Sequence, residues 1–219
     1  MKLYGYFRSS ASYRVRIALN LKGLDYEHVG VHLVKNGGEH LSDAFRAINP
    51  EGLVPALTDT YDGAELELSQ SLAILEYLDE KYPQYPLLPA DLGLRAQVRS
   101  FALSIACEIH PVNNLRILKY LSQTLGVTDE QKNAWYRHWC ETGLIALEKK
   151  LSRDGIRHAF CYGDKPGYAD CLLVPQIFNA QRFQCDLSQV PELMRINQNC
   201  LEHPAFIKAH PANQPDADA

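Results

Sequence analysis

The sequence predicts an α/β domain with a mixed sheet, followed by an all-helical domain. In the first part of the 219 residues, short apolar segments of strand-like composition alternate with segments of helical spacing, which is the pattern of βαβ units. After a proline-containing stretch the apolar residues recur at helical spacing alone, as in a helical bundle. We expect a first domain at 1–83, a linker at 84–91, a helical domain at 92–210 and a tail at 211–219.

The first domain has local signals for four strands and two helices. Residues 2–7 are aromatic and short enough for a buried strand, and a helical pattern follows as far as Lys22. Further on, a Tyr-Asp-Gly turn at 61–63 separates two short strand-like segments, which predicts an antiparallel hairpin. We expect strands at 2–7, 26–33, 56–60 and 65–67, and a second helix from Ser71 to Tyr82.

In the second half the helical pattern covers 92–123, 129–152, 168–182 and 191–201. Pro111 and Pro175 lie inside two of these segments, where proline bends a helix. Asp170, three residues after Gly167, predicts half of a capping box at the start of the third segment. The polar, proline-rich residues 210–219 are expected to be extended or loosely ordered.

Composition and charge restrict the class of protein. Hydrophobic residues make up 46% of the chain, the net charge is −4, and no long run of Lys or Arg indicates a nucleic-acid surface. No apolar stretch reaches the roughly 18 residues that span a bilayer, and the chain enters a strand without a signal-peptide core. The six cysteines show neither a C-x-x-C pair nor metal-ligand spacing. We expect a cytoplasmic protein with reduced thiols, no metal site, and neither membrane nor nucleic acid as partner.

A serine cluster lies between the end of the first predicted strand and the start of the first predicted helix. Ser9, Ser10 and Ser12 belong to the segment FRSSASYRVRI at 7–17. The first N–H groups of a helix lack intrahelical partners and the helix dipole adds positive charge there, so an anion or a thiolate is favoured. The alternative is that Ser12 only caps the helix.

Two further segments have the composition of ligand sites. Pro55 directly precedes a predicted strand, and a cis Val54–Pro55 bond would explain its position. Such a bend leaves the Val54 backbone able to pair with an extended, peptide-like ligand. Gln70 and Ser71 open the second helix of this domain, where a carboxylate could bind, or where Ser71 is an ordinary cap.

These segments together resemble the zeta class of glutathione transferases. The resemblance rests on RSSASYRVRIAL at 8–19, EGLVPAL at 51–57 and QSLAILEYL at 70–78, and continues through 109–121 and 166–183 in the helical half. It implies a thioredoxin-like first domain, glutathione as cofactor, and a homodimer. The class is similar to maleylacetoacetate isomerase and the bacterial maleylpyruvate isomerases, which use glutathione to turn a cis double bond into a trans one.

The resemblance also implies roles for individual residues. Ser9 and Ser10 match the catalytic hydroxyls that stabilise the glutathione thiolate, with Ser12 nearby. Ala11 stands where the family often has cysteine, so the nucleophile must come from glutathione. Matching contacts to glutathione are the backbone at Val54 and Pro55, the carboxylate site at Gln70 and Ser71, His40 at the glycyl end, and His110, Asn114, Leu115 and Arg116 in the helical half. His40 could instead be a solvated loop residue, and His110 could satisfy a carbonyl freed by Pro111.

The implied substrate is a dicarboxylate, which guanidinium groups bind with paired hydrogen bonds. Arg8, Arg116 and Arg182 match arginines at the substrate site of the maleylpyruvate branch, although each could be a surface ion-pair partner. Arg14 is assigned mainly to the structure of the motif.

The expected reaction is addition of glutathione thiolate to the cis double bond, rotation, and release of glutathione, with arginines stabilising the developing negative charge. We favour maleylacetoacetate to fumarylacetoacetate, in aromatic amino-acid breakdown such as tyrosine degradation. The alternatives are a maleylpyruvate isomerase of the gentisate pathway, a glutathione-conjugating or dehalogenating transferase, and a noncatalytic binding protein.

Overall fold

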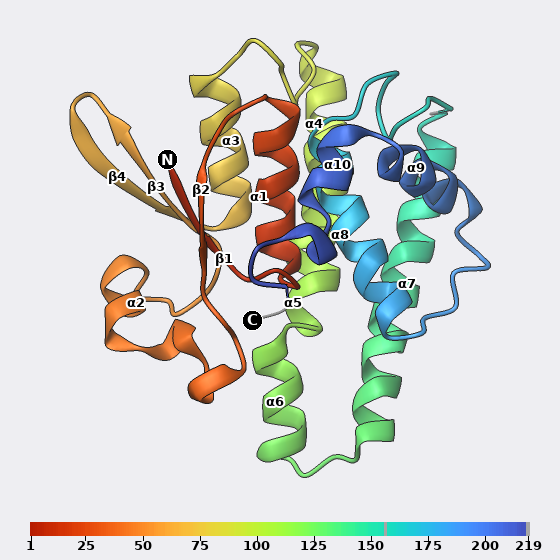
Figure 1. Cartoon of the computed structure of the whole chain (residues 1–219). Coiled ribbons are helices and arrows are strands. Elements are labelled where there is room, and N and C mark those ends of the chain that lie inside the picture. The colour runs from red at the N-terminus through yellow and green to blue at the C-terminus, as the bar shows by residue number, and fades with distance from the viewer. Residues whose placement is uncertain (156, 218–219) are drawn as a thin grey trace. The chain divides into compact units, whose positions relative to one another are not determined.

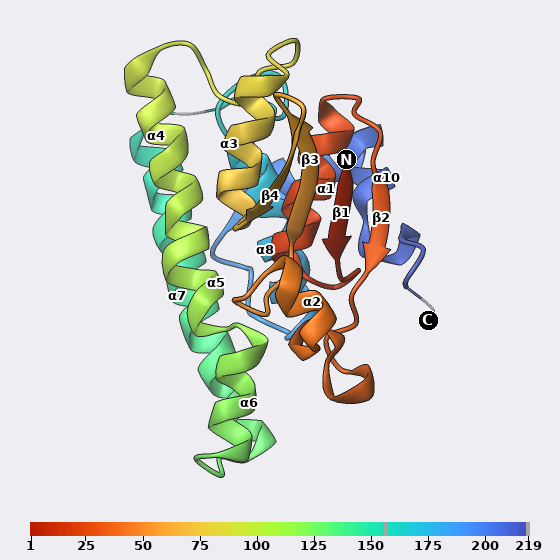
Figure 2. The same ribbon diagram turned by 90° about the vertical axis from the view of Figure 1, so that its left-hand side faces the viewer.

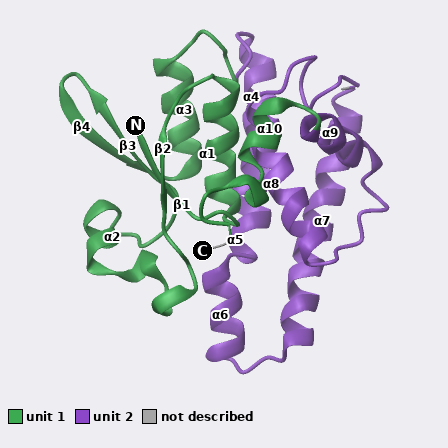
Figure 3. Cartoon of the chain, viewed as in Figure 1, with its two compact units in different colours: residues 1–87, 202–219 green, residues 88–201 purple. Residues whose placement is uncertain are grey.

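The computed structural model describes residues 1–155 and 157–217. The chain forms two compact units (Figure 3): the first is Met1–Leu87 together with Glu202–Ala219, and the second is Leu88–Leu201. Residues 218 and 219 of the expected tail lie outside the described residues.

The first unit contains a mixed four-stranded sheet in the order β2-β1-β3-β4 (Figures 1 and 2). β1 (Lys2–Gly5) pairs in parallel with β2 (Glu27–Gly30) and antiparallel with β3 (Ala56–Tyr61), and β3 forms a hairpin with β4 (Ala64–Ser69). The predicted thioredoxin-like sheet and its hairpin are therefore confirmed. The first strand ends at Gly5, and Tyr6 and Phe7 belong to the loop that leads into the first helix.

Two long helices lie side by side on one face of this sheet (Figures 1 and 2): α1 (Ser10–Leu21) and α3 (Ser71–Lys81). Their apolar residues form the main core with the strands; Leu3, Ile17, Leu57, Ile74 and Leu75 are fully buried. Each such side chain contributes about 1.5–3 kcal/mol of burial free energy. The packing of this core fixes both helices on the sheet, and with them the positions of their N-termini.

The remaining helices of the first unit are short, and local periodicity did not predict them. They are η1 (Lys35–Gly37), η2 (Glu39–Leu41), α2 (Asp43–Ile48), α10 (Pro204–Ala209) and η4 (Pro211–Asn213). Phe45 of α2 packs with Val31 and Ala56 in a separate small core. A helix of six residues spans fewer than two turns, too few for a clear period.

The C-terminal residues differ from our expectation. We placed 92–210 in the helical domain, whereas α10 packs on α1 and groups with the first unit. The reason is burial: Ala205, Phe206 and Ala209 are covered by this contact. The tail was expected to be extended or loosely ordered, yet it forms η4 and makes hydrogen bonds as far as Ala217.

The second unit is helical in its described residues apart from loops and one isolated β-bridge. Its helices are α4 (Leu92–Leu103), η3 (Ser104–Ile109), α5 (His110–Val112), α6 (Leu115–Gln123), α7 (Asp129–Arg153), α8 (Tyr168–Arg182) and α9 (Pro191–Leu201). None of the helices in the described residues is long and apolar enough to cross a bilayer.

The segment expected as one helix at 92–123 is interrupted. A π-helical stretch, η3, precedes Pro111, and the chain restarts at Asn114, which caps α6. Proline has no N–H and cannot continue the ladder of the preceding turn. Asn113 is buried at the break and donates from Nδ2 to the Tyr136 carbonyl at 3.2 Å, which anchors the bend to α7.

The start of α8 agrees with the sequence prediction. The buried Asp170 accepts the Gly167 N–H at 2.8 Å and the Cys161 N–H at 2.9 Å. The predicted half of a capping box is therefore present, and Asp170 also ties the loop before α8 to the helix.

Candidate active site

The serine cluster lies at the N-terminus of α1, as predicted, but the cap is Ser9. The Ser9 Oγ accepts the Ser12 N–H at 3.2 Å, and the Ser9 N–H donates to the Tyr6 carbonyl at 2.9 Å. The interpretation of Ser12 as the cap is therefore wrong. Residue 9 has extended backbone angles, as a cap requires, whereas residue 12 is already helical.

Ser12 instead joins the helix to the first strand. It is fully buried, and its Oγ accepts the Tyr6 N–H at 3.4 Å. A Cβ at Gly5 would lie 3.2 Å from the Ser12 Cβ, so the close approach of strand and helix depends on that glycine. The position of the loop between them is set by this packing.

The N-terminal turn of α1 provides a positive end without a compensating charge. The helix has no acidic residue in its first turn. Ser9 and Ala11 are half-buried, and Ser10 is buried. The helix dipole and the Ser9 hydroxyl therefore act together at this spot, and both favour an anionic group.

The loop before β3 has the predicted bend: the Val54–Pro55 peptide bond is cis. Its support is Asn49, which is only 2% exposed. Asn49 donates from Nδ2 to the Leu53 carbonyl at 2.7 Å and accepts the Glu51 N–H at 3.2 Å. Among the described residues, no hydrogen bond is found for the Val54 N–H or C=O, so both backbone groups can pair with an extended ligand.

The N-terminus of α3 is the second place where a carboxylate fits. No side chain caps this helix, and its first turn has no acidic residue. Gln70 has φ +67°, a conformation that costs a non-glycine residue about 1–3 kcal/mol and occurs preferentially at functional sites. The interpretation of Ser71 as an ordinary cap is wrong, because Ser71 is the first residue within the helix.

Three charged or amide side chains surround this N-terminus within the first unit. Arg14 is 2% exposed and donates from Nη1 to the Ser71 Oγ at 3.2 Å. The Gln70 Nε2 donates to the Glu51 Oε2 at 2.8 Å at the surface. Arg14 thus adds a buried positive charge below the first turn of α3, in line with the structural role assigned to it.

His40 lies in η2 and is half-buried. A Cβ at Gly38 would lie 2.5 Å from the His40 Cε1, and Gly38 has φ +109°. The ring therefore packs over a backbone that only glycine allows. His40 is therefore more buried than a solvated loop histidine.

Arg8 is exposed and contacts two aromatic rings. Its Nη2 and Nε donate to the Tyr6 hydroxyl at 2.7 and 3.2 Å, and its guanidinium carbon lies 5.0 Å from the centre of the Phe7 ring. No ion pair to a carboxylate is found for Arg8 among the described residues. The guanidinium is therefore oriented by neutral groups and keeps its charge for an anionic ligand.

The predicted residues of the second unit fall at helix ends. His110 begins α5, and Asn114 caps α6 by accepting the Arg116 N–H at 3.1 Å. Leu115 is the first residue of α6, followed by the exposed Arg116. Arg182 is the exposed last residue of α8, with its guanidinium carbon 5.0 Å from the Phe183 ring centre. A positive charge is favourable at that helix end.

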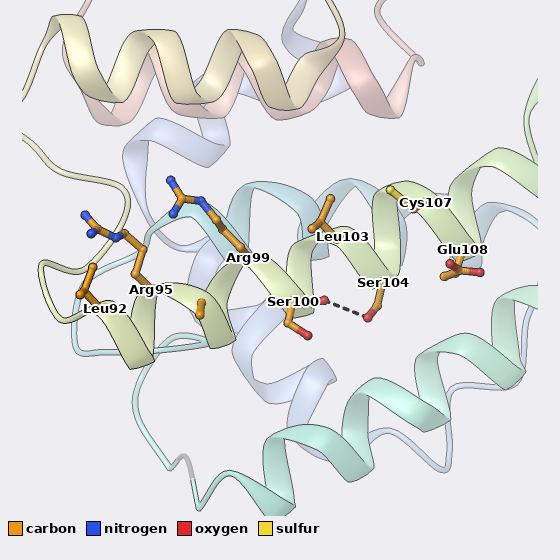
Figure 4. Close-up of a pocket in the computed structure, with 9 residues that line it drawn as sticks. Leu92, Arg95, Arg99, Ser100, Leu103, Ser104, Cys107 and Glu108 are labelled. Atoms are coloured by element: carbon orange, nitrogen blue, oxygen red, sulfur yellow. Dashed lines mark hydrogen bonds between the residues drawn. The ribbon is translucent and has the colours of Figure 1, made fainter.

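A shallow groove runs along one face of α4 and η3 (Figure 4), and none of the predicted site residues lines it. Leu92 at its start is 73% exposed. Ser104 is turned toward the helix and donates to the Ser100 carbonyl at 2.9 Å. The lining residues are Leu92, Arg95, Ala96, Arg99, Ser100, Leu103, Ser104, Cys107 and Glu108.

Sequence reasoning missed the residues that support the site. Asn49 holds the cis-proline loop, Glu51 contacts Gln70, and Tyr6 orients Arg8. The Asn-Pro pair at 49–50 was a local signal for a turn residue at Asn49. No local signal exists for the contact of Asp216 with the serine loop, because 209 residues separate the partners.

Residues 3–86 match the family model for the glutathione S-transferase N-terminal domain. The chain is 52% identical over 218 residues to a probable maleylacetoacetate isomerase of Vibrio cholerae, covering 98% of this chain and 97% of that protein. It is 50% identical to a maleylpyruvate isomerase of a Ralstonia species, covering 99% and 100%, and 49% identical to a maleylacetoacetate isomerase of Pseudomonas aeruginosa over the whole of both chains.

Solved structures agree. The holo structure of a maleylpyruvate isomerase, a bacterial glutathione S-transferase in the zeta class, superposes with a TM-score of 0.93 at 49% identity and covers 99% of this chain and 100% of its own. A maleylacetoacetate isomerase of Methylobacterium extorquens, with malonate and glutathione bound, gives 0.92 at 41% identity over the whole of both chains. The expected family is confirmed: this chain belongs to the zeta class of the glutathione S-transferases.

Proposed function

We propose that this protein is a glutathione-dependent cis–trans isomerase of a maleyl keto dicarboxylate, with maleylacetoacetate as the substrate and fumarylacetoacetate as the product. The observation that carries the proposal is the pair of helix N-termini in the first unit, joined by the bond from Arg14 to Ser71. Neither α1 nor α3 has an acidic residue in its first turn. One such N-terminus suits a thiolate and the other a carboxylate, the two anionic groups at the cysteinyl and γ-glutamyl parts of glutathione.

The residues of the first unit fit the tripeptide along its length. The γ-glutamyl carboxylate binds at Gln70 and Ser71, the cysteinyl backbone pairs with Val54 beside Pro55, and the glycyl end lies at His40. Support comes from the unpaired backbone of Val54 and the uncapped α3. When bound, glutathione supplies the thiolate that adds to the cis double bond and leaves after rotation.

Ser9 and Ser10 hold the sulfur in its charged form. The Ser9 oxygen already accepts the Ser12 N–H, so its hydroxyl hydrogen is left to donate to an anion. Ala11 brings no thiol to this turn, and Ser12 supports the turn from within the fold. A thiol is mostly protonated at neutral pH, and these donors shift it toward the nucleophilic thiolate.

The substrate carboxylates are bound by Arg8, Arg116 and Arg182. All three are exposed, and the guanidinium groups of Arg8 and Arg182 rest on aromatic side chains. A guanidinium held this way loses less conformational freedom when it takes a carboxylate in a bidentate manner. The same charges stabilise negative charge that develops at the substrate carbonyl during addition.

His110, Asn114 and Leu115 complete the glutathione and substrate contacts from the helical unit, which is the proposed substrate domain. Asn114 already uses its side-chain oxygen to cap α6. Its amide nitrogen remains a donor for a ligand.

The protein is also proposed to be a homodimer in the cytoplasm. Its six cysteines are all free, as a reducing compartment would keep them. Leu92 and Leu103, both exposed on α4, give a second copy an apolar surface to cover. Sedimentation velocity of the purified chain measures the oligomeric state; a monomer at micromolar concentration would contradict the dimer.

The function is tested by ultraviolet absorbance with maleylacetoacetate and with maleylpyruvate, each with and without glutathione, while free thiol is titrated. Isomerisation that needs glutathione and leaves thiol constant supports the isomerase, and the faster substrate selects between the two. Maleylpyruvate is the second candidate because relatives of both names are about equally similar. Loss of thiol without a trans product would instead identify a conjugating or dehalogenating transferase.

A further inference from the structure

We propose that Asp216, in the C-terminal segment, is a positioning residue for Ser9. The proposal rests on the proposed function only in taking Ser9 as the residue that stabilises the thiolate. The contacts that carry it lie within the first unit and join residues near the N-terminus to residues near the C-terminus.

Asp216 binds the loop directly before the catalytic serines. Its Oδ2 accepts the Phe7 N–H at 2.9 Å, and its Oδ1 lies 3.0 Å from the Nε2 of His28 on β2. The side chains of Asp216 and His28 are 13% and 9% exposed. Phe7 is two residues before Ser9, so one largely buried carboxylate links the serine loop to a strand of the sheet.

Arg16 holds the same loop through its carbonyls. This fully buried guanidinium donates to the Phe7 carbonyl at 2.9 Å, to the Tyr6 carbonyl at 3.4 Å and to the Ala209 carbonyl at 3.1 Å. Phe7 therefore has its N–H bound by an acidic side chain and its C=O bound by a basic one. The Tyr6 carbonyl also accepts the Ser9 N–H, so Arg16 and the capping residue Ser9 donate to the same carbonyl.

The C-terminal segment is itself ordered by specific bonds. The Gln214 Nε2 donates to the carbonyls of Lys208 and His210 at 2.9 and 3.0 Å, and the Ala217 N–H donates to the Gln214 carbonyl at 3.0 Å. A Cβ at Gly30 would lie 3.2 Å from the Asp216 Cβ. The aspartate thus approaches β2 closely at a position where the strand carries no side chain.

The carboxylate is in its charged form at neutral pH. Burial alone would raise the pKa of Asp216, but the hydrogen bond and charge of His28 and the Phe7 N–H outweigh burial and lower it. The Arg16 guanidinium remains charged as well, because burial lowers its pKa only to about 10. Charge-assisted hydrogen bonds of this kind hold a loop more firmly than neutral ones.

The consequence is that the placement of the Ser9 hydroxyl depends on residue 216. Without the carboxylate, the Phe7 N–H loses its partner and the loop gains freedom directly before the cap. Small displacements of a group that must face a reacting atom reduce rates steeply, although the group itself is intact. Asp216 would therefore affect the chemistry of the thiol without touching it.

The test compares Asp216→Ala with Asp216→Asn and with the control Asn213→Ala. Asn213 donates from Nδ2 to the Ile207 carbonyl at 2.7 Å, so its loss removes one hydrogen bond from the same segment without touching the loop. The amide of Asp216→Asn keeps a neutral acceptor for the Phe7 N–H, but its nitrogen cannot accept a hydrogen bond from His28. The measurements are kcat, KM for glutathione, the melting temperature, and the pKa of glutathione bound to each variant, from thiolate absorbance.

Asp216→Ala is expected to lower kcat about tenfold and to raise the bound-thiol pKa, with KM for glutathione changed little. Asp216→Asn keeps only a neutral acceptor for the Phe7 N–H, so it should fall between the wild type and Asp216→Ala in both measurements. Asn213→Ala should match the wild type. Unchanged kcat and thiol pKa in Asp216→Ala would overturn the proposal, as would an equal effect of Asn213→Ala. If Asp216→Ala does not fold, hydrogen exchange of residues 6–9 in Asp216→Asn decides, because the neutral amide holds the Phe7 N–H less firmly than the carboxylate. Faster exchange than in Asn213→Ala supports the positioning role of Asp216, and equal exchange overturns it.

The thiol titration also separates this proposal from the proposed function. If the wild type binds glutathione but isomerises neither maleyl substrate, the isomerase assignment fails. The effect of Asp216 on the bound-thiol pKa can still be measured in that case and decides the positioning role by itself.

Discussion

Removing the Ser9 hydroxyl should raise the pKa of bound glutathione. In Ser9→Ala the sulfur loses one hydroxyl donor, and hydrogen bonds to charged groups contribute about 1.5–3 kcal/mol. Since one pKa unit corresponds to about 1.4 kcal/mol, the expected rise is about 1–2 units. The free thiol has a pKa of about 8.5, so a loss of this size removes most of the thiolate present at neutral pH. We expect kcat/KM to fall about 10- to 100-fold.

The same substitution also removes a helix cap, and the two effects must be separated. The Ser9 Oγ accepts the Ser12 N–H at 3.2 Å, and loss of a cap costs about 1 kcal/mol of folding free energy. Thr128 is a matched control, because its Oγ1 accepts the Gln131 N–H at the same 3.2 Å at the start of α7. Thr128→Ala should lose similar stability with no change in thiol chemistry.

The assay is a pH titration of thiolate absorbance with glutathione bound, combined with urea unfolding of both variants. A bound-thiol pKa in Ser9→Ala equal to that of the wild type would refute the reasoning, even if activity fell. In that case the dipole of α1 or Ser10 would be the main source of thiolate stabilisation.

Three further predictions follow from the site and its support. Arg8→Ala and Arg182→Ala should each raise KM for the dicarboxylate or lower kcat while leaving the Kd for glutathione unchanged, and unchanged kinetics in both would remove these arginines from the substrate site. Asn49→Ala should cost about 2–4 kcal/mol in urea unfolding, because two hydrogen bonds are lost and the Leu53 carbonyl is left unpaired; a loss below about 1 kcal/mol would contradict this. Hydrogen bonds from Lys81 and Tyr77 outweigh burial and lower the pKa of Asp59, so its stabilisation is present above the unfolded value of about 3.9 and is lost as the pH falls through the lower folded value. The difference in unfolding free energy between wild type and Asp59→Asn should therefore shrink below about pH 4, and a difference independent of pH would contradict the ion pair.

The predicted elements that the structure confirms are those with long local periods. The helices at α1, α3, α7, α8 and α9 and the β3–β4 hairpin have apolar spacing or turn residues that need no distant partner to be recognised. The errors lie where tertiary contacts decide: α10 is six residues long and exists because it covers α1. The interruption near Pro111 was predicted as a bend, but the π-helical stretch before it packs on α7 and α8 and has no local signal in the sequence.

The candidate site divides in the same way. The sequence placed Ser9 by the change from a strand pattern to a helix pattern. It placed the Val54–Pro55 bend by the position of the proline, and the start of α3 at Ser71 by helix spacing. The sequence could not show which serine caps the helix, because neighbouring serines differ only in backbone angles that the fold imposes. Ser12 is buried against Gly5 because strand and helix approach each other there.

By itself, the sequence determined the two-part fold class, the helix N-termini that favour anions, and the family, because these depend on residues within a few positions of one another. Only the tertiary structure decided how the site is held: Asn49 under the cis-proline loop, Arg14 below α3, and Arg16 and Asp216 on either side of Phe7. The physical reason is that a hydrogen bond depends on distance and direction in space. Partners that are 209 residues apart leave no periodic or local trace in the chain.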